Sequence, residues 1–274
     1  MTYFAPLTTL AAVAVLSVTP AFSATEAELD TLFEAIGTPK LIEIMRVEGI
    51  DQADEIRESM FPDRANGWQP IVSSIYDTRR METGFRAAFD QEFSDSDVTP
   101  LLEFFGSDLG RQIISLELSA REALMDEGVE EAAKVAYGAL ETGDPARFEA
   151  LAAFVDDNDL IELNVAGALN ASLAFYRGLA DGGSFDLTED VMLRDVWEQE
   201  PEIRSETTDW MFPYLAMAYE PLSDEELAAY KALSLTDAGR DLNRALFAGF
   251  DQVFNQISYS LGNAASRFMQ GDDI

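Results

Sequence analysis

Carboxylates are the most abundant side chains in this sequence that could do chemistry. The 274 residues include 51 Asp and Glu against 18 Lys and Arg, which gives a net charge of −33. Paired carboxylates can transfer protons or hold cations. At this density, however, such pairs arise at helical spacing throughout the chain, so they single out no site.

The residue types that are absent exclude whole classes of chemistry. The chain has no Cys and no His, and therefore no disulfide, thiolate nucleophile, imidazole metal ligand or Ser-His-Asp triad. Glycine-rich dinucleotide and phosphate loops and the GxSxG hydrolase pattern are missing too. The sequence thus predicts no catalytic, cofactor-binding or metal-binding residue and no cofactor, and it favours a protein that is not an enzyme.

One acidic loop comes closest to a calcium-binding pattern. It runs Asp95-Ser-Asp97-Val-Thr99. An EF-hand loop requires glycine at its sixth position and glutamate at its twelfth, where this chain has Pro100 and Gly106. No metal site is expected there.

Two short units of the same type stand far apart in the chain, at Ser107–Arg111 and Thr236–Arg240. Each reads Ser/Thr-Asp-x-Gly-Arg. The hydroxyl suits a helix N-cap, and the aspartate suits the positive end of the helix dipole. A helical glycine costs roughly 1 kcal/mol relative to alanine, so Gly110 and Gly239 indicate places where another helix approaches closely.

The arginines of these units, Arg111 and Arg240, have two interpretations. Each could brace a helix crossing through a bridge to a carboxylate, or the pair could face a groove and bind an anionic ligand. Two tryptophans, Trp68 and Trp197, lie at the same offset as the two units. We expect them to be core anchors rather than ligand-stacking platforms. These six residues are the candidate structural or ligand-facing positions.

Matched tryptophans and matched Ser/Thr-Asp-x-Gly-Arg units indicate an internal repeat. The sequence predicts a first helical repeat over residues 24–150 and a second over residues 151–274. Each repeat would need the apolar face of the other, with a groove between them.

Residues 1–23 read as a secretory signal peptide. A short apolar run from Leu7 is broken by Pro20, and Ala21-Phe22-Ser23 places small residues before a cleavage point. The run is too short to span a membrane, and no later stretch of about 20 apolar residues follows. The mature protein is therefore expected to be soluble, without a transmembrane segment, and periplasmic or secreted from a bacterium.

Helical punctuation dominates the remaining sequence, whereas strand signals are scarce. Gly37-Thr38-Pro39 and Gly143-Asp144-Pro145 each read as a helix end followed by a cap and a first-turn proline. Ser223 and Glu226 form a capping-box pattern. The prediction is an all-α bundle of about nine or ten helices, built from two related halves.

The stretch Leu222-Ser-Asp-Glu-Glu-Leu-Ala-Ala-Tyr230, followed by Thr236–Arg240, resembles the DUF2059 family of exported bacterial helical domains. Leu101–Phe105 and Ser107–Arg111 resemble it a second time, although Pro100 departs from the pattern. The resemblance implies a helical periplasmic protein, and it brings no activity, cofactor or catalytic residue because the family has no assigned function.

Three functions remain open. The leading hypothesis is a non-enzymatic binding or interaction protein of the bacterial periplasm, with an envelope protein or a small ligand as partner. The alternatives are an acidic structural protein that responds to cations and, less favoured, a carboxylate-dependent hydrolase. Nucleic acid is excluded as a partner because a polyanion would be repelled by the negative charge.

Overall fold

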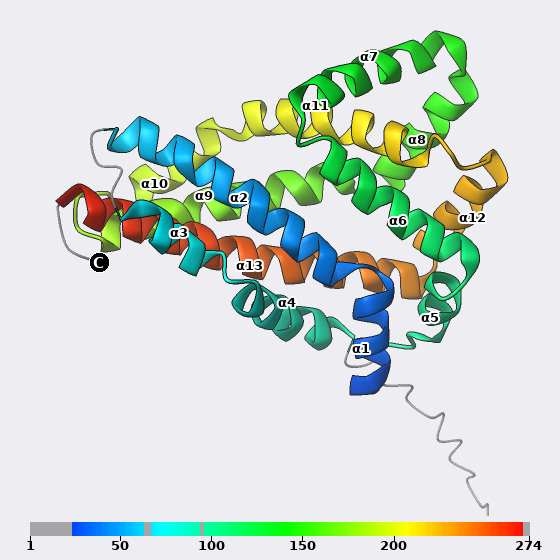
Figure 1. Ribbon diagram of the computed structural model, residues 1–274, viewed down its shortest axis with the longest axis horizontal. Coiled ribbons are helices and arrows are strands. Elements are labelled where there is room, and N and C mark those ends of the chain that lie inside the picture. Colours follow the sequence, from blue (N-terminus) through cyan, green and yellow to red (C-terminus); the bar gives the residue numbers. More distant parts are fainter. Residues whose placement is uncertain (1–23, 63–66, 94–95, 271–274) are drawn as a thin grey trace, which may run out of the picture.

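The protein is all-α, as the sequence predicts. The computed structural model describes residues 24–62, 67–93 and 96–270, and these form thirteen helices and no strand (Figure 1). The expectation of nine or ten helices is wrong because the chain breaks more often, as where α10 ends at Glu198 and α11 begins at Glu200. The segment expected to be a signal peptide, 1–23, lies outside the described residues.

The helices follow one another with short connections. In chain order they are α1 (Glu26–Ala35), α2 (Thr38–Met60), α3 (Trp68–Ile75), α4 (Thr78–Glu92), α5 (Thr99–Phe105), α6 (Asp108–Ala123), α7 (Glu127–Gly143), α8 (Pro145–Asp157), α9 (Leu160–Asp181), α10 (Glu189–Glu198), α11 (Glu200–Tyr219), α12 (Asp224–Ser234) and α13 (Asp237–Gln270).

Most of the helix starts follow from local capping chemistry. The Asp144 side chain accepts a hydrogen bond from the Arg147 amide at the start of α8. Ser223 and Glu226 form the expected capping box before α12. At α2 the expected cap is wrong, since Thr38 is the first helical residue and the cap is Gly37, with a left-handed φ of 71°.

The hydrophobic core consists of two clusters that interleave along the chain. The first cluster takes its buried residues mainly from α1–α5 and from α13. The second takes them from α6, α8, α11 and α12. Each cluster therefore draws on residues from both sides of the expected boundary at residue 150. In Figure 1, α13 runs beneath α2 and beside α4, two helices that lie far from it in the sequence.

A very close helix crossing joins α9 to α13. A Cβ atom added to Gly178 would lie 2.1 Å from the backbone oxygen of Tyr259, and one added to Gly262 would lie 2.1 Å from that of Phe175. Only glycine lets two backbones approach this closely. The pair fixes α13, the longest of the described helices, against α9.

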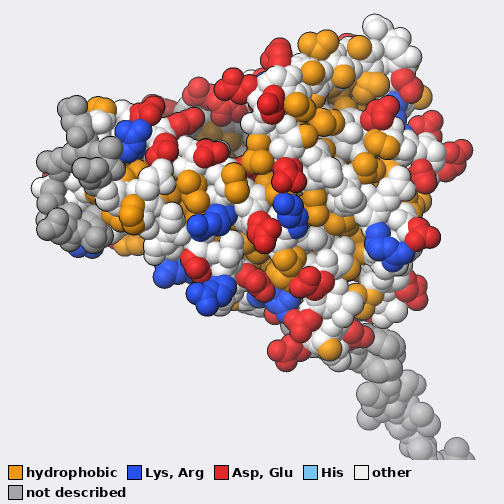
Figure 2. All heavy atoms as spheres, in the orientation of Figure 1, with side chains coloured by type: hydrophobic (Ala, Val, Ile, Leu, Met, Phe, Trp, Pro, Cys, Tyr) orange, Lys and Arg blue, Asp and Glu red, His pale blue; other side chains and the backbone are white. Residues whose placement is uncertain are grey.

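On the face shown in Figure 2, acidic side chains are spread over the surface, and arginine and lysine side chains lie mostly in its lower part. None of the described helices combines the length and the apolar composition needed to cross a membrane.

Candidate functional site

The two Ser/Thr-Asp-x-Gly-Arg units adopt the same local structure. Ser107 accepts a hydrogen bond from the Gly110 amide at 3.1 Å, and Thr236 accepts one from the Gly239 amide at 3.0 Å. Each glycine packs on the last turn of the helix before it. An added Cβ would lie 2.1 Å from the backbone oxygen of Phe104 or Leu233. The expected close approach is therefore made by the adjacent short helix.

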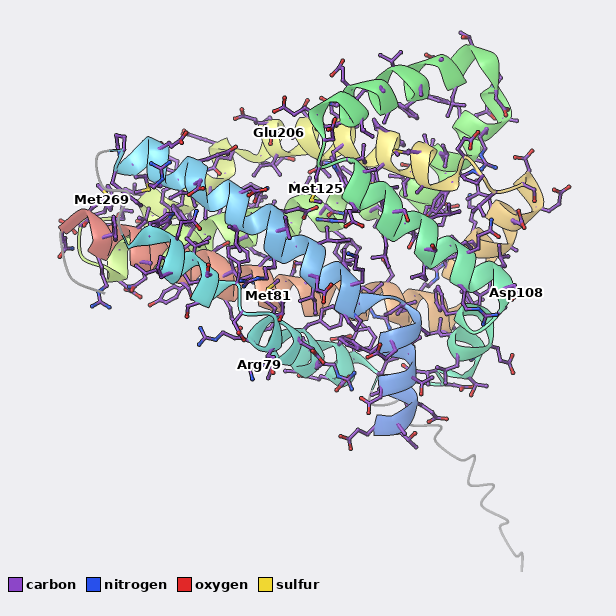
Figure 3. The ribbon with its side chains drawn as sticks, viewed as in Figure 1. Arg79, Met81, Asp108, Met125, Glu206 and Met269 are labelled. Atoms are coloured by element: carbon purple, nitrogen blue, oxygen red, sulfur yellow. The ribbon has the colours of Figure 1, made fainter. Side chains whose placement is uncertain are left out.

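The arginines of these units lie at the surface and close the turn that precedes their own helix. Arg111 donates to the backbone oxygen of Gly106 and pairs with Asp108. Arg240 donates to the backbone oxygen of Leu235 at 3.3 Å. Figure 3 shows Asp108 at the outer end of α6, where it points away from the molecule. The structure thus shows bracing contacts, and it does not bring the two arginines together around a groove.

The two tryptophans differ in burial. Trp68 is fully buried and donates its indole N–H to the backbone oxygen of Ala53 at 2.9 Å. Trp197 is 66% exposed. The expectation of a core anchor is thus confirmed for Trp68 and wrong for Trp197, because α10 turns that side chain towards solvent.

The strongest candidate site is a cavity of about 500 Å³ between the two core clusters. Residues of α2, α5, α6, α8, α9, α11, α12 and α13 line it, and most are apolar. Its volume lies within the ~300–1,000 Å³ typical of small-molecule sites. Of the six candidate residues from the sequence, only Gly239 lines this cavity.

Aromatic rings cover one side of the cavity. Trp210 stacks on Tyr214 with ring centroids 4.8 Å apart, and both belong to α11. Phe154 contacts the rings of Tyr219 and Tyr230, at 5.8 and 5.4 Å between centroids. This side therefore combines flat apolar faces with several phenol hydroxyls.

Glu117 of α6 is the polar centre of this aromatic side. The Tyr219 hydroxyl donates to its Oε1 atom at 2.7 Å, and Tyr214 donates to its backbone oxygen at 3.3 Å. Burial raises the pKa of the Glu117 carboxyl, and hydrogen bonds from Tyr219 and Tyr230 oppose that shift. Burial and the neighbouring Glu117 raise the pKa of Tyr219 and Tyr230, so both phenols remain donors.

Two further ionisable groups of opposite charge line the cavity. Arg121, one turn after Glu117, pairs with Glu48 at 2.8 Å and lies over the Trp210 ring at 5.4 Å. Asp251 of α13 is half-buried, and burial raises the pKa of its carboxyl. The only basic side chain of the lining is thus already paired, whereas Asp251 faces the cavity without an ion pair among the described residues.

The sequence analysis missed Glu117, although a signal for it was present. Ile113, Ala120 and Leu124 are buried on one face of α6, and Glu117 falls on that face at helical spacing. A single carboxylate in an apolar stripe costs free energy unless it is hydrogen-bonded. Such a residue marks either a buried polar network or a site.

Metal binding finds no support in the arrangement of side chains. Within residues 24–62, 67–93 and 96–270, no group of three or more acidic side chains is placed to hold an ion. The acidic loop at Asp95 lies partly outside the described residues. Asp97 accepts a hydrogen bond from the Thr99 amide at 2.9 Å, as a turn residue does.

Comparison with known proteins agrees with the resemblance in part of the chain. The model of the family described as "Uncharacterized protein conserved in bacteria (DUF2059)" matches residues 79–136. No curated protein and no solved structure matches the chain. The matched segment runs from α4 into α7 and contains Ser107–Arg111 and Glu117. The second stretch, at Leu222–Arg240, lies outside it, so a tandem copy stays a prediction. Over residues 79–136 the chain is similar to DUF2059, a bacterial family of uncharacterised function.

Proposed function

We propose that this protein is a non-enzymatic binding protein of the bacterial periplasm that holds a small, largely apolar molecule between its two core clusters. The observation that carries the proposal is the cavity of about 500 Å³. A concave and mostly apolar recess of this size, lined by eight helices, is typical of places where small molecules bind.

The chemistry of the lining supports a ligand with one polar end. Apolar side chains of α9 and α13 would contact a hydrocarbon part. Glu117 and the hydroxyls around it would fix the orientation of a polar group. Small-molecule sites commonly have this division between an apolar wall and a few placed polar groups.

A pair of substitutions on α9 tests whether the cavity binds. Ala168 lines the cavity, whereas Ala166 is exposed on the same helix. We expect 1-dodecanol to raise the unfolding temperature of the full chain and to change Trp210 emission. Ala168→Leu should abolish both effects, while Ala166→Leu should leave them intact. Equal binding by both variants would refute the cavity as the site.

Export to the periplasm is proposed from the leader-like segment at residues 1–23. Cell fractionation and N-terminal sequencing of the mature chain test it. A periplasmic product beginning at Ala24 is expected, and a cytoplasmic product that retains Met1 would contradict it.

Two related halves are proposed from the order of the helices. The series α1–α6 corresponds in order to α8–α13, with α7 between them. A left-handed residue precedes both α2 and α9, at Gly37 and Asp159. The matched caps Ser107 and Thr236 precede α6 and α13. In this scheme the last helix of each half packs into the cluster formed mainly by the other half.

The two alternative functions have weaker support. The hypothesis of a cation-responsive structural protein is supported by the net charge of −33. It requires that millimolar calcium stabilise the fold more than sodium at equal ionic strength. A carboxylate-dependent hydrolase would need two carboxyls acting together. Glu117 and Asp251 share the cavity, but no hydrogen bond joins them and neither shifts the pKa of the other.

A further inference from the structure

We propose that the ligand of this cavity is a lipophilic amine, whose ammonium group binds the Glu117 carboxylate while its hydrocarbon part lies along the apolar lining. The inference rests on the proposed binding function and names the class of its ligand. Its basis is the charge and hydrogen-bonding capacity of the groups that line the cavity.

Glu117 has room for another donor. An ionised carboxylate offers about four lone-pair positions. Tyr219 donates to Oε1, and Tyr230 also hydrogen-bonds the carboxyl. An ammonium group has three donors and no acceptor, so it can occupy the remaining positions. Its charge would favour the ionised carboxylate and offset the effect of burial.

The aromatic side of the cavity also suits a cation. The hydroxyls of Tyr219 and Tyr230 hydrogen-bond the Glu117 carboxyl and stabilise its negative charge, which an ammonium group would neutralise. The Arg121 guanidinium lies over the face of the Trp210 ring, which is a cation–π contact. The protein thus contains one cation–π contact at the edge of the site proposed for a second cation.

The same groups disfavour an anionic ligand. A fatty acid carboxylate would lie near Glu117 and Asp251, and its only basic neighbour in the lining, Arg121, is held by Glu48. Like charges at short range in a poorly hydrated site repel strongly. The net charge of −33 also raises the local concentration of cations and lowers that of anions.

The test compares three twelve-carbon ligands that differ only in their polar end. Dodecylamine, 1-dodecanol and dodecanoate are titrated into the full chain at pH 7, below their micelle concentrations, at two ionic strengths. We expect the amine to bind about tenfold or more tightly than the alcohol, because a hydrogen bond to a charged group is stronger than a neutral one. Dodecanoate should bind weakest. The preference should persist at high salt, which screens attraction to the outer surface.

Glu117→Gln supplies the decisive variant. It should remove the preference, so that the amine and the alcohol bind this variant with similar affinity. The matched control is Glu122→Gln, on the same helix, where the side chain is 53% exposed and pairs with Lys40. That control should bind like the wild type. An amine that binds no better than the alcohol, or a Glu117→Gln variant that keeps the preference, would overturn the amine assignment while the cavity remains a binding site. Failure of all three ligands to bind would overturn the proposed function with it.

Discussion

Gly178 shows how one missing side chain determines the approach of two long helices. A Cβ atom added there would lie 2.1 Å from the backbone oxygen of Tyr259 and 2.8 Å from the backbone nitrogen of Asn263. Gly178→Ala must therefore push α9 and α13 apart, and overpacking of this kind costs about 1–3 kcal/mol. Urea unfolding of the variant should show a loss of that order.

A second glycine provides the matched control. Gly138 lies in α7 with nothing within 4 Å of an added Cβ. Gly138→Ala should stabilise the protein by up to about 1 kcal/mol, since alanine is the better helix former. If both variants shift the free energy of unfolding in the same direction, the close contact between α9 and α13 does not depend on glycine at position 178.

The buried carboxyl of Glu117 predicts a pH dependence of stability. Burial holds its pKa in the folded state above the ordinary value of 4.5. The protonated carboxyl therefore contributes fully to the stability of the fold below pH 4.5. This contribution is lost as the pH rises through the raised pKa, because ionisation then favours the unfolded chain. Glutamine does not ionise, so the stability of Glu117→Gln relative to the wild type should increase between pH 4 and pH 8.

Thermal unfolding across this pH range checks the expectation, with Glu122→Gln as the control. Its difference from the wild type should stay nearly constant because its side chain is mostly solvated. A constant difference for Glu117→Gln as well would mean that the pKa of the carboxyl is the same in the folded and the unfolded chain.

At the scale of elements, Arg147 joins three helices. It is 9% exposed and belongs to α8. It donates to the backbone oxygens of Tyr219 and Leu222, where α11 ends, and to Asp224 at the start of α12. Arg147→Met removes the donor to the buried Leu222 oxygen, which costs about 1–3 kcal/mol, whereas the Tyr219 oxygen still accepts from the Leu222 amide.

An exposed arginine provides the comparison. Arg177 has a 51% exposed side chain and pairs with Glu189. Surface pairs of this kind contribute less than about 1 kcal/mol, so Arg177→Met should change the urea midpoint little. If Arg147→Met lowers the urea midpoint no more than Arg177→Met does, the turn between α11 and α12 does not depend on Arg147.

The sequence predicts these elements where the determining contacts are local. Asp144, Ser107 and the Ser223–Glu226 box act within three residues of themselves, and all three caps are present. The break between α10 and α11 at Gln199 has no glycine and no capping side chain, and its one local signal is Pro201 in the first turn of α11. The burial of Trp68 and the exposure of Trp197 depend on which helices pack over them.

The cavity could not be predicted for the same reason. Glu117, Tyr219 and Tyr230 come from three helices, and their contact depends on how α6, α11 and α12 pack. The apolar stripe of α6 shows that Glu117 is unusual, yet nothing in its neighbourhood along the chain identifies the tyrosines. Local patterns predicted the scaffold, while the site arises from contacts between distant segments.

At the scale of the whole molecule, the interleaved clusters predict that neither half is stable alone. The helix α13 completes the cluster formed by α1–α5, and α6 packs with α8, α11 and α12. A chain of residues 24–143 would expose the apolar surface that α13 covers, and residues 144–274, which keep α8 whole, would lack α6. Because hydrophobic burial is the main stabilising contribution, each half should unfold without a cooperative transition.

Circular dichroism during urea unfolding tests this expectation on the two halves, expressed separately and then mixed. Each half alone should show a broad transition at low urea concentration. The mixture should recover a single cooperative transition, because the interface that forms within one chain can also form between two. Two halves that each unfold cooperatively, with no gain on mixing, would show that the clusters do not depend on each other. In that case α6 and α13 would be accessory to their clusters, and a cavity lined from both sides would owe its shape to docking of two preformed units.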